Sequence, residues 1–287
     1  WLGFPNATHP LAGALEGKNN VALDNWLVNL SGEYELLEGL KLKSTVGVQT
    51  TETLQKVFRP QIDLVNPKTL ATTSLAVSGN PLSAWNRFRK QRDITFITTL
   101  TYAKTFADNH NLTALAGFNQ ETNRFQSITA SKDNLPSNEL QEISAGSTDP
   151  TAEGRTIDFG LQSFFGRLNY DFRGKYLFEA NVRYDGSSNF GEGNKWGLFP
   201  SFSAGWNIAK EAFMDSADFM DELKLRGSWG QLGNQNISPN QFATIYSLGQ
   251  GYSFGGNLVG GAAQTNLPNA DVTWETSTQT DIGLDFL

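Results

Sequence analysis

The sequence predicts an all-β fold, a segment of an antiparallel transmembrane β-barrel with about nine meandering strands and both edges open. Three observations support this class. Apolar and polar residues alternate with a period of two through most of the chain. The alternating stretches are long enough to cross a bilayer, which takes about 9 to 11 tilted residues, against about 5 to 6 in a soluble strand. The connections are alternately short and long, which is typical of periplasmic turns and extracellular loops.

Residues 160–172 and 176–186 carry the clearest alternation and are predicted to form a hairpin. Pairing Phe172 with Tyr176 across the turn at 173–175 keeps the apolar residues of both strands on one face. The same register sets Tyr170 against Phe178 and Leu168 against Ala180. A long hairpin in a soluble sandwich is the alternative for this stretch alone.

The N-terminal part is predicted to begin with a loop over 1–21, which is rich in Pro, Gly and Asn. Strands are expected from Ala22 to Leu36 and over 40–49, joined by a three-residue turn at 37–39. That turn would place opposite charges across the ladder, Glu35 facing Lys41 and Glu33 facing Lys43. Each such pair supports the register by about 0.2 to 1 kcal/mol.

The rest of the chain continues the pattern. Further strands are predicted over 91–103, 110–121, 197–208, 222–233 and 273–287. Long connections are expected over 51–90, 122–159, 187–196 and 234–272, the last with a strand extension near 242–254, whereas the short ones cover 104–109 and a helical turn at 209–221. A soluble sandwich has no reason to keep its long loops at one end, so the barrel is favoured.

Composition supports this interpretation. The 287 residues include 28 Gly and 20 Phe, and the longest apolar run is too short for a membrane-spanning helix. No signal peptide is expected, because no apolar N-terminal segment precedes a cleavage site. The absence of cysteine excludes disulfides and thiolate metal sites. The net charge of −7 argues against a nucleic-acid partner.

Aromatic residues at the apolar positions of the alternation are predicted to contact the lipid interface, because amphipathic rings prefer the boundary between lipid and water. They are Tyr34, Tyr102, Tyr170, Phe172, Tyr176, Tyr184, Trp206 and Trp229.

Residues that could carry catalysis or hold a metal or cofactor do not form a recognisable constellation. His9 and His110 have no partner motif. Gly227, Gly230 and Gly233 lie in a predicted strand and favour close packing over nucleotide binding. The acidic residues Asp215, Asp218, Asp221 and Glu222 lack calcium-loop spacing and are interpreted as a solvated face. The run Asp185–Asn189 is interpreted as a tight turn, with a ligand role as the alternative. We therefore predict that the chain is not an enzyme and has no cofactor.

Several segments, in order, resemble the barrel of the SusC/RagA-like TonB-dependent outer-membrane transporters. They are FGRLNYDFRGKYLFEANVRYDGSSNFG, KWGLFPSFSAGWNIAKEAF, LKLRGSWGQLGNQNI and TWETSTQTDIGLDF, with YELLEGLKLKSTVG and YAKTFADNHNLTALAGF as further hairpins. The resemblance implies a larger barrel with a plugged lumen, a SusD-like surface lipoprotein, import of oligosaccharides or peptides powered through TonB, and the outer membrane of a Bacteroidetes-like Gram-negative bacterium.

Residues 1–287 depart from that family in carrying no plug, N-terminal extension or C-terminal strands, so we interpret them as an internal part of the barrel. A passive porin, an adhesin barrel and a soluble carbohydrate-binding protein are the alternatives.

The long connections are the predicted place for substrate contact, since functional residues concentrate in long loops. Trp85, Arg87, Arg89, Tyr246 and Tyr252 supply rings and planar donors suited to sugars or peptides. The alternative is that these side chains only pack the loops together.

Overall fold

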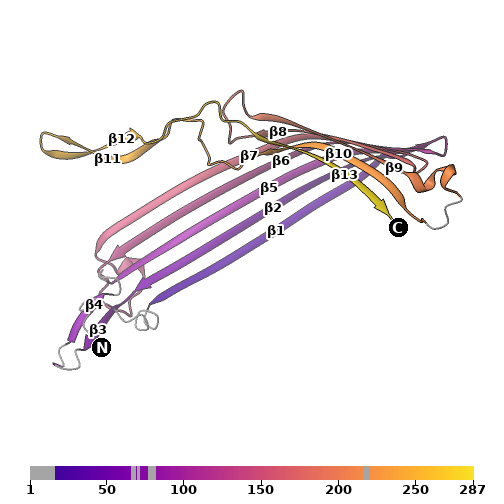
Figure 1. Cartoon of the computed structure of the whole chain (residues 1–287). Coiled ribbons are helices and arrows are strands. Elements are labelled where there is room, and N and C mark those ends of the chain that lie inside the picture. Colours follow the sequence, from indigo (N-terminus) through magenta and orange to yellow (C-terminus); the bar gives the residue numbers. More distant parts are fainter. Residues whose placement is uncertain (1–16, 66–68, 70–71, 77–81, 216–219) are drawn as a thin grey trace. The chain divides into compact units, whose positions relative to one another are not determined.

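The computed structural model describes residues 17–65, 69, 72–76, 82–215 and 220–287. Nine strands form one antiparallel sheet in which the spatial order follows the chain, as Figure 1 shows. The strands are β1 (Lys18–Leu37), β2 (Leu40–Arg59), β5 (Ser83–Phe106), β6 (His110–Asp133), β7 (Thr148–Phe172), β8 (Tyr176–Ser187), β9 (Trp196–Asn207), β10 (Leu223–Asn234) and β13 (Glu275–Phe286). This confirms the predicted nine-stranded meander with open edges at β1 and β13.

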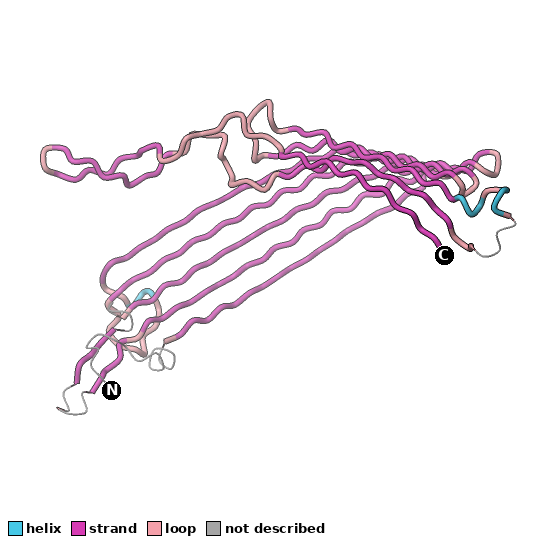
Figure 2. The backbone as a smooth tube through the Cα atoms, viewed as in Figure 1, coloured by secondary structure: helices cyan, strands magenta, loops and turns pink. Residues whose placement is uncertain are grey.

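Two hairpins form small sheets of their own (Figure 2). β3 (Gln61–Val65) pairs with β4 (Thr72–Ala76), and β11 (Tyr246–Phe254) pairs with β12 (Asn257–Gln264). The helical segments of the described residues are three single 3-10 turns, η1 (Ile143–Ala145), η2 (Ile208–Lys210) and η3 (Ala212–Met214). Within the described ranges, none of the helices has the length and apolar character needed to cross a membrane.

The chain divides into two compact units. The first comprises Trp1–Val28, Val48–Asp93 and Asn123–Asp158, and the second comprises Asn29–Gly47, Ile94–Thr122 and Phe159–Leu287. Strands β1, β2, β5, β6 and β7 each contribute residues to both units, whereas β8, β9, β10 and β13 belong to the second alone.

The register of the second unit keeps one apolar face continuous. Phe172 pairs with Tyr176, as predicted, and the further predicted pairs Tyr170 with Phe178 and Leu168 with Ala180 also form. The next two strands continue the same rows, because Ala180 pairs with Phe202 and Phe202 pairs with Trp229. Since side chains alternate between faces, the residues of one row point to the same side of the sheet.

Two of the predicted long connections are wrong in extent. Over 51–90 the structure continues β2 to Arg59 and starts β5 at Ser83, and over 122–159 it continues β6 to Asp133 and starts β7 at Thr148. These strands have 20 to 25 residues, more than the roughly 9 to 11 that a bilayer requires. Beyond the lipid both faces can be polar, so backbone pairing persists after the apolar alternation has stopped.

The first hairpin turns at Glu38 and Gly39, between the end of β1 at Leu37 and the start of β2 at Leu40, and Thr51 on β2 contacts Asn25 on β1, as the predicted register requires. Gly39 takes φ +78° in this turn. Glycine adopts a positive φ without steric cost. The observed ion pair of Lys41 is with Glu33, at 3.8 Å between Nζ and Oε1. Glu35 instead accepts the backbone N–H of Gly39 at 3.4 Å.

Among the described residues, buried apolar side chains are few in both units. In the first unit, Phe58, Leu82, Ala84 and Leu135 form a small core against η1. In the second, Phe190 and Phe199 are buried. Most of the chain therefore holds its shape through the strand ladder, with the apolar sheet face left uncovered by any described residue.

Candidate functional site

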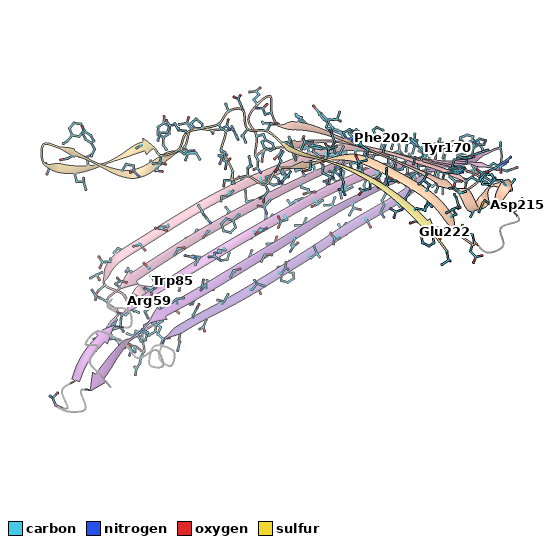
Figure 3. All side chains as sticks on the ribbon, viewed as in Figure 1. Arg59, Trp85, Tyr170, Phe202, Asp215 and Glu222 are labelled. Carbon is cyan, nitrogen blue, oxygen red and sulfur yellow. The ribbon has the colours of Figure 1, made fainter. Side chains whose placement is uncertain are left out.

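The apolar face of the second unit is exposed in the described part of the chain. Its members show 39% to 52% of their surface: Phe164, Leu168, Phe178, Val182, Phe202 and Leu225. A contiguous apolar surface of this kind is unfavourable in water and matches a surface that contacts lipid. No described sheet or helix layer covers it, which the soluble-sandwich alternative would require. Figure 3 shows Tyr170 and Phe202 in this part of the molecule.

An aromatic row ends this face next to the short turns. Phe172 and Tyr176 stack with ring centroids 6.3 Å apart, and Tyr176 pairs in register with Trp206. The Tyr170 hydroxyl lies 2.7 Å from Nδ1 of His110, whose ring also contacts Phe172 at 4.6 Å. These contacts position rings at one level of the sheet, as the predicted lipid interface requires.

Glu211, in the connector after β9, binds this aromatic row from outside the strands. Its carboxylate accepts hydrogen bonds from the Tyr176 hydroxyl at 2.7 Å, the Trp206 indole N–H at 3.1 Å and the Lys175 ammonium at 3.0 Å. These donors, Tyr176 first, lower the pKa of Glu211 to about 2. The connector is therefore anchored to the ring positions through one charged group.

A second aromatic pair lies toward the long-loop end. Tyr184 stacks on Trp196 with centroids 4.8 Å apart and planes at 17°. Sequence reasoning missed Trp196 because it fell in the predicted loop 187–196, although β9 begins at this residue. Trp196 lies flat over Gly186, where a Cβ would stand 2.8 Å from the indole ring.

The other predicted interface residues occupy different positions. Tyr34 is exposed on β1, Tyr102 is half-buried on β5, and Trp229 stacks on Phe202 in the middle of β10, with centroids 6.1 Å apart. For all eight predicted rings, contact with the lipid interface stays a prediction.

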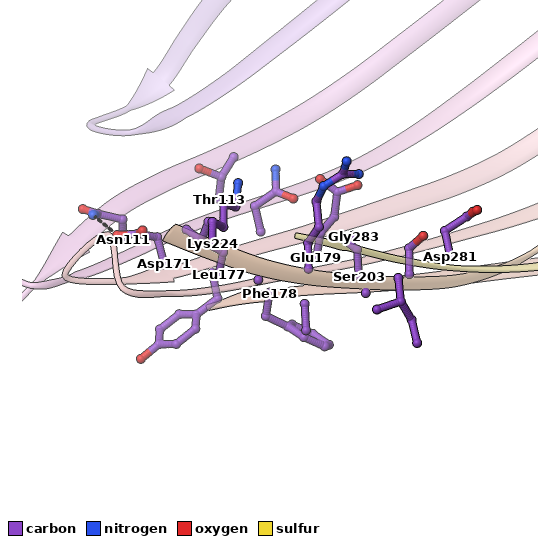
Figure 4. Close-up of a pocket in the computed structure, with 18 residues that line it drawn as sticks. Asn111, Thr113, Asp171, Leu177, Phe178, Glu179, Ser203, Lys224, Asp281 and Gly283 are labelled. Atoms are coloured by element: carbon purple, nitrogen blue, oxygen red, sulfur yellow. Dashed lines mark hydrogen bonds between the residues drawn. The ribbon is translucent and has the colours of Figure 1, made fainter. Parts of the chain in front are cut away.

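The opposite face of the second unit is polar and hollowed. A concavity of about 700 Å³ lies against it, lined by charged and hydroxyl-bearing side chains that include Glu179, Ser203, Lys224, Arg226 and Asp281. Figure 4 shows Glu179 and Lys224 on one side of the strands and Phe178 on the other. Arg226 forms an ion pair with Asp285 at 3.1 Å. Such a surface suits contact with water and polar solutes.

An aromatic cluster lies where the polar face meets the loops of the second unit. Phe190 and Phe199 contact Trp274 with centroids 5.2 and 5.3 Å apart, and the Trp274 indole donates to the Lys195 carbonyl at 2.9 Å. Gly233 makes room for this packing, because a Cβ there would stand 2.1 Å from Phe199 Cζ. The cluster was not predicted, since its members come from two loops and one strand.

The residues considered for chemistry take structural roles where they are described. His110 bonds to Tyr170, as noted, whereas His9 and Asp218 lie outside the described residues. Among described residues, no three or more of His, Cys, Asp and Glu gather as metal ligands. The predicted close packing of the strand glycines is confirmed at Gly230, where a Cβ would stand 2.8 Å from Ser201 Cβ.

The predicted tight turn at 185–189 is wrong. Asp185, Gly186 and Ser187 are strand residues of β8, and Asp185 pairs with Arg183 at 3.1 Å. Only Ser188 and Asn189 leave the strand, and Asn189 donates to the Gln235 carbonyl at 3.3 Å. Asp185-Gly186 looks like a turn signal in the sequence, but the glycine is needed here because the Trp196 ring packs directly against it.

The predicted substrate residues fall into two groups. Trp85, Arg87 and Arg89 lie on strand β5 in the first unit, and Arg87 stacks over Trp85 at 5.1 Å. Tyr246 and Tyr252 lie on the exposed β11–β12 hairpin in the second unit. The prediction of loop positions is therefore wrong for β5, because that strand begins earlier than expected. Their role in binding stays a prediction.

Comparison with known proteins identifies the family. The family model described as "TonB dependent receptor-like, beta-barrel" matches residues 4–287. The chain belongs to this family. It is 32% identical to TonB-dependent receptor P3 of Formosa agariphila over 96% of the chain and 27% of that receptor. It is 29% identical to TonB-dependent receptor SusC of Bacteroides thetaiotaomicron over 98% of the chain and 27% of SusC.

A solved structure of the RagAB peptide transporter matches 94% of the chain and 29% of its own chain, with 26% identity and a TM-score of 0.82. The chain thus spans about a quarter to three tenths of the length of these relatives. The resemblance to SusC/RagA-like TonB-dependent receptors is confirmed, and with it the location in the outer membrane of a Bacteroidetes-type bacterium. This is a transport family, which also confirms that the chain is not an enzyme.

Proposed function

We propose that residues 1–287 form part of the wall of an outer-membrane importer that takes up oligosaccharides or peptides with energy supplied through TonB. One sheet face is apolar and exposed, and the other is charged and hollowed by about 700 Å³. This contrast between the faces carries the proposal, because a wall between lipid and an aqueous lumen needs both.

We further propose that β1 and β13 pair with other strands of the full receptor. Unpaired backbone groups at an open edge cost several kcal/mol each in hydrocarbon, so an isolated nine-stranded sheet would not persist in a membrane. The relatives are long enough to supply those strands, since the chain covers 26% to 29% of them.

A SusD-like lipoprotein is the proposed partner at the long-connection end. The similarity to SusC and to the RagAB peptide transporter supports this partner. The strand extensions of the first unit and the exposed β11–β12 hairpin offer protein surface beyond the length that lipid covers. We expect Trp85, Arg87 and Arg89 to contact substrate in the first unit, and Tyr246 and Tyr252 to contact it in the second.

The test uses the full-length parent receptor in its own bacterium. Growth of a deletion strain on defined glycans and peptides identifies the substrate, and complementation then compares the intact receptor with a variant lacking residues 246–264. We expect the variant to assemble in the outer membrane but to lose uptake or lipoprotein association. Unchanged uptake and unchanged association would contradict a binding role for this hairpin. Uptake that continues when TonB is deleted would contradict active import and indicate a porin.

A further inference from the structure

A recess of about 270 Å³ in the first unit gathers three arginines from two strands of one sheet. Arg87 and Arg89 come from β5 and Arg155 from β7, with the hydroxyls of Ser127 and Thr129 on β6 between them. Within one strand, residues two positions apart lie on the same face, as Arg87 and Arg89 do on β5 and Ser127 and Thr129 do on β6. The recess therefore presents five hydrogen-bond-donating side chains to a single point of the surface.

The guanidinium groups are oriented before any ligand arrives. Arg87 lies over the Trp85 ring at 5.1 Å and donates from Nε to the Thr129 hydroxyl at 3.1 Å. Arg155 lies over the Phe125 ring at 5.3 Å. Stacking on a ring restricts a flexible arginine, so less conformational freedom is lost on binding.

The charge of the recess is unbalanced. Glu153 is its only acidic lining residue, against three arginines. Within the described residues, neither Arg89 nor Arg155 forms an ion pair, whereas Arg124, on the other face of β6, pairs with Asp158 at 2.6 Å. Unpaired guanidinium groups beside hydroxyl donors form a binding site for an oxyanion, and arginine binds carboxylates through two parallel hydrogen bonds.

The neighbouring backbone favours a peptide over a glycan as the carrier of that oxyanion. β8 pairs with β7 only over Leu161–Phe172, so within the described residues the part of β7 that holds Arg155 has no strand on its β8 side. An extended peptide can add to such an edge and present alternate side chains to one face. Trp85 and Phe125 already carry guanidinium groups, which leaves these ring faces unavailable for stacking on a sugar.

We propose that this recess binds a carboxylate of an acidic peptide that lies along the free edge of β7, with Arg89 and Arg155 as its main contacts. The proposal deepens the proposed function and rests on it, because it names the class of ligand that the importer selects.

The experiment measures binding to the purified full-length receptor by calorimetry. The probes are a short peptide of alternating Glu and Thr, the same peptide with Gln in place of Glu, oligogalacturonate and sodium sulfate. We expect Arg89→Gln and Arg155→Gln each to weaken binding of the Glu peptide by about ten-fold or more, since a hydrogen bond to a charged group is worth that much. The matched control is Arg92→Gln, which removes the same charge from an exposed even-numbered position of β5; we expect it to change affinity by less than about two-fold.

Equal affinity for the Glu and Gln peptides would overturn the proposal. Equal losses of affinity for the Glu peptide in Arg89→Gln, Arg155→Gln and the control Arg92→Gln would also overturn it. Binding of oligogalacturonate without the Glu peptide would replace the peptide with a carboxylated glycan, and binding of sulfate alone would reduce the recess to a free-anion site. Calorimetry requires no TonB, so a receptor that binds the Glu peptide but does not import it would contradict the proposed function and leave this inference standing.

Discussion

Replacing Phe202 by arginine places a charge on the apolar face at the depth where it should lower the stability of the folded receptor most. Phe202 lies four positions before Trp206, whose ring belongs to the aromatic row at the short-turn end. At about 3.4 Å per residue and a tilt of about 45°, this spacing corresponds to a depth of about 10 Å. The apolar band of such barrels is about 25 Å tall, so Phe202 lies close to its middle, where arginine costs about 2 to 4 kcal/mol.

The assay is urea-induced unfolding of the full-length parent receptor from liposomes, with Ser203→Arg as the control. Ser203 is the next residue along β9 and lines the polar concavity beside Glu179, where an added arginine should change stability by less than about 0.5 kcal/mol. Phe202→Leu separates out the lost ring contact with Trp229, worth about 0.5 to 1.5 kcal/mol. Equal effects of the two arginine variants would refute the assignment of the faces.

Three further predictions concern single contacts. The pKa of Glu211 in the folded protein is about 2, below its usual 4.5, so its contribution to stability is present above about pH 4.5 and is lost as pH falls toward 2. Glu211→Gln should therefore shrink the difference in unfolding temperature between these two pH values. An unchanged difference would count against Glu211 as an anchor of the connector. Gly233→Leu should lower the free energy of unfolding by about 1 to 3 kcal/mol, because the new side chain forces Phe199 aside. Gly227→Ala should be tolerated, because the nearest atom to a Cβ there is 3.8 Å away. Heat-dependent gel mobility measures both effects. His110→Ala should let the Tyr170 ring reorient faster, which fluorine labelling of the ring detects, with no change expected at Tyr184. Unchanged mobility of the Tyr170 ring in the variant would show that the 2.7 Å contact with His110 does not restrain it.

The strands inside the lipid could be predicted because one face must be apolar there. The register of Phe172 with Tyr176 followed from that requirement alone and is confirmed. Beyond the lipid the requirement disappears, so the extension of β6 to Asp133 has no apolar parity and was predicted as a loop. The short turn of the first hairpin could also be predicted, since Gly39 supplies the positive φ there.

The functional surfaces were predicted less well for a related reason. The chemistry of Arg87 and Arg89 marks them as candidate binding residues from sequence alone. Arg155 lies in a stretch without apolar alternation, so the sequence does not place it on the same face as the other two. The packing of Phe190 and Phe199 on Trp274 joins residues far apart in sequence, and no local pattern encodes it.

The most direct test of the central claim is a nitroxide scan of β8 in the full-length receptor in liposomes. The chain contains no cysteine, so each label position from Leu177 to Tyr184 can be introduced singly into this segment. We predict that collision with oxygen, which concentrates in lipid, is high at even positions and collision with a water-soluble nickel complex is high at odd positions. A scan without this period of two, or with the two sets exchanged, would contradict the account.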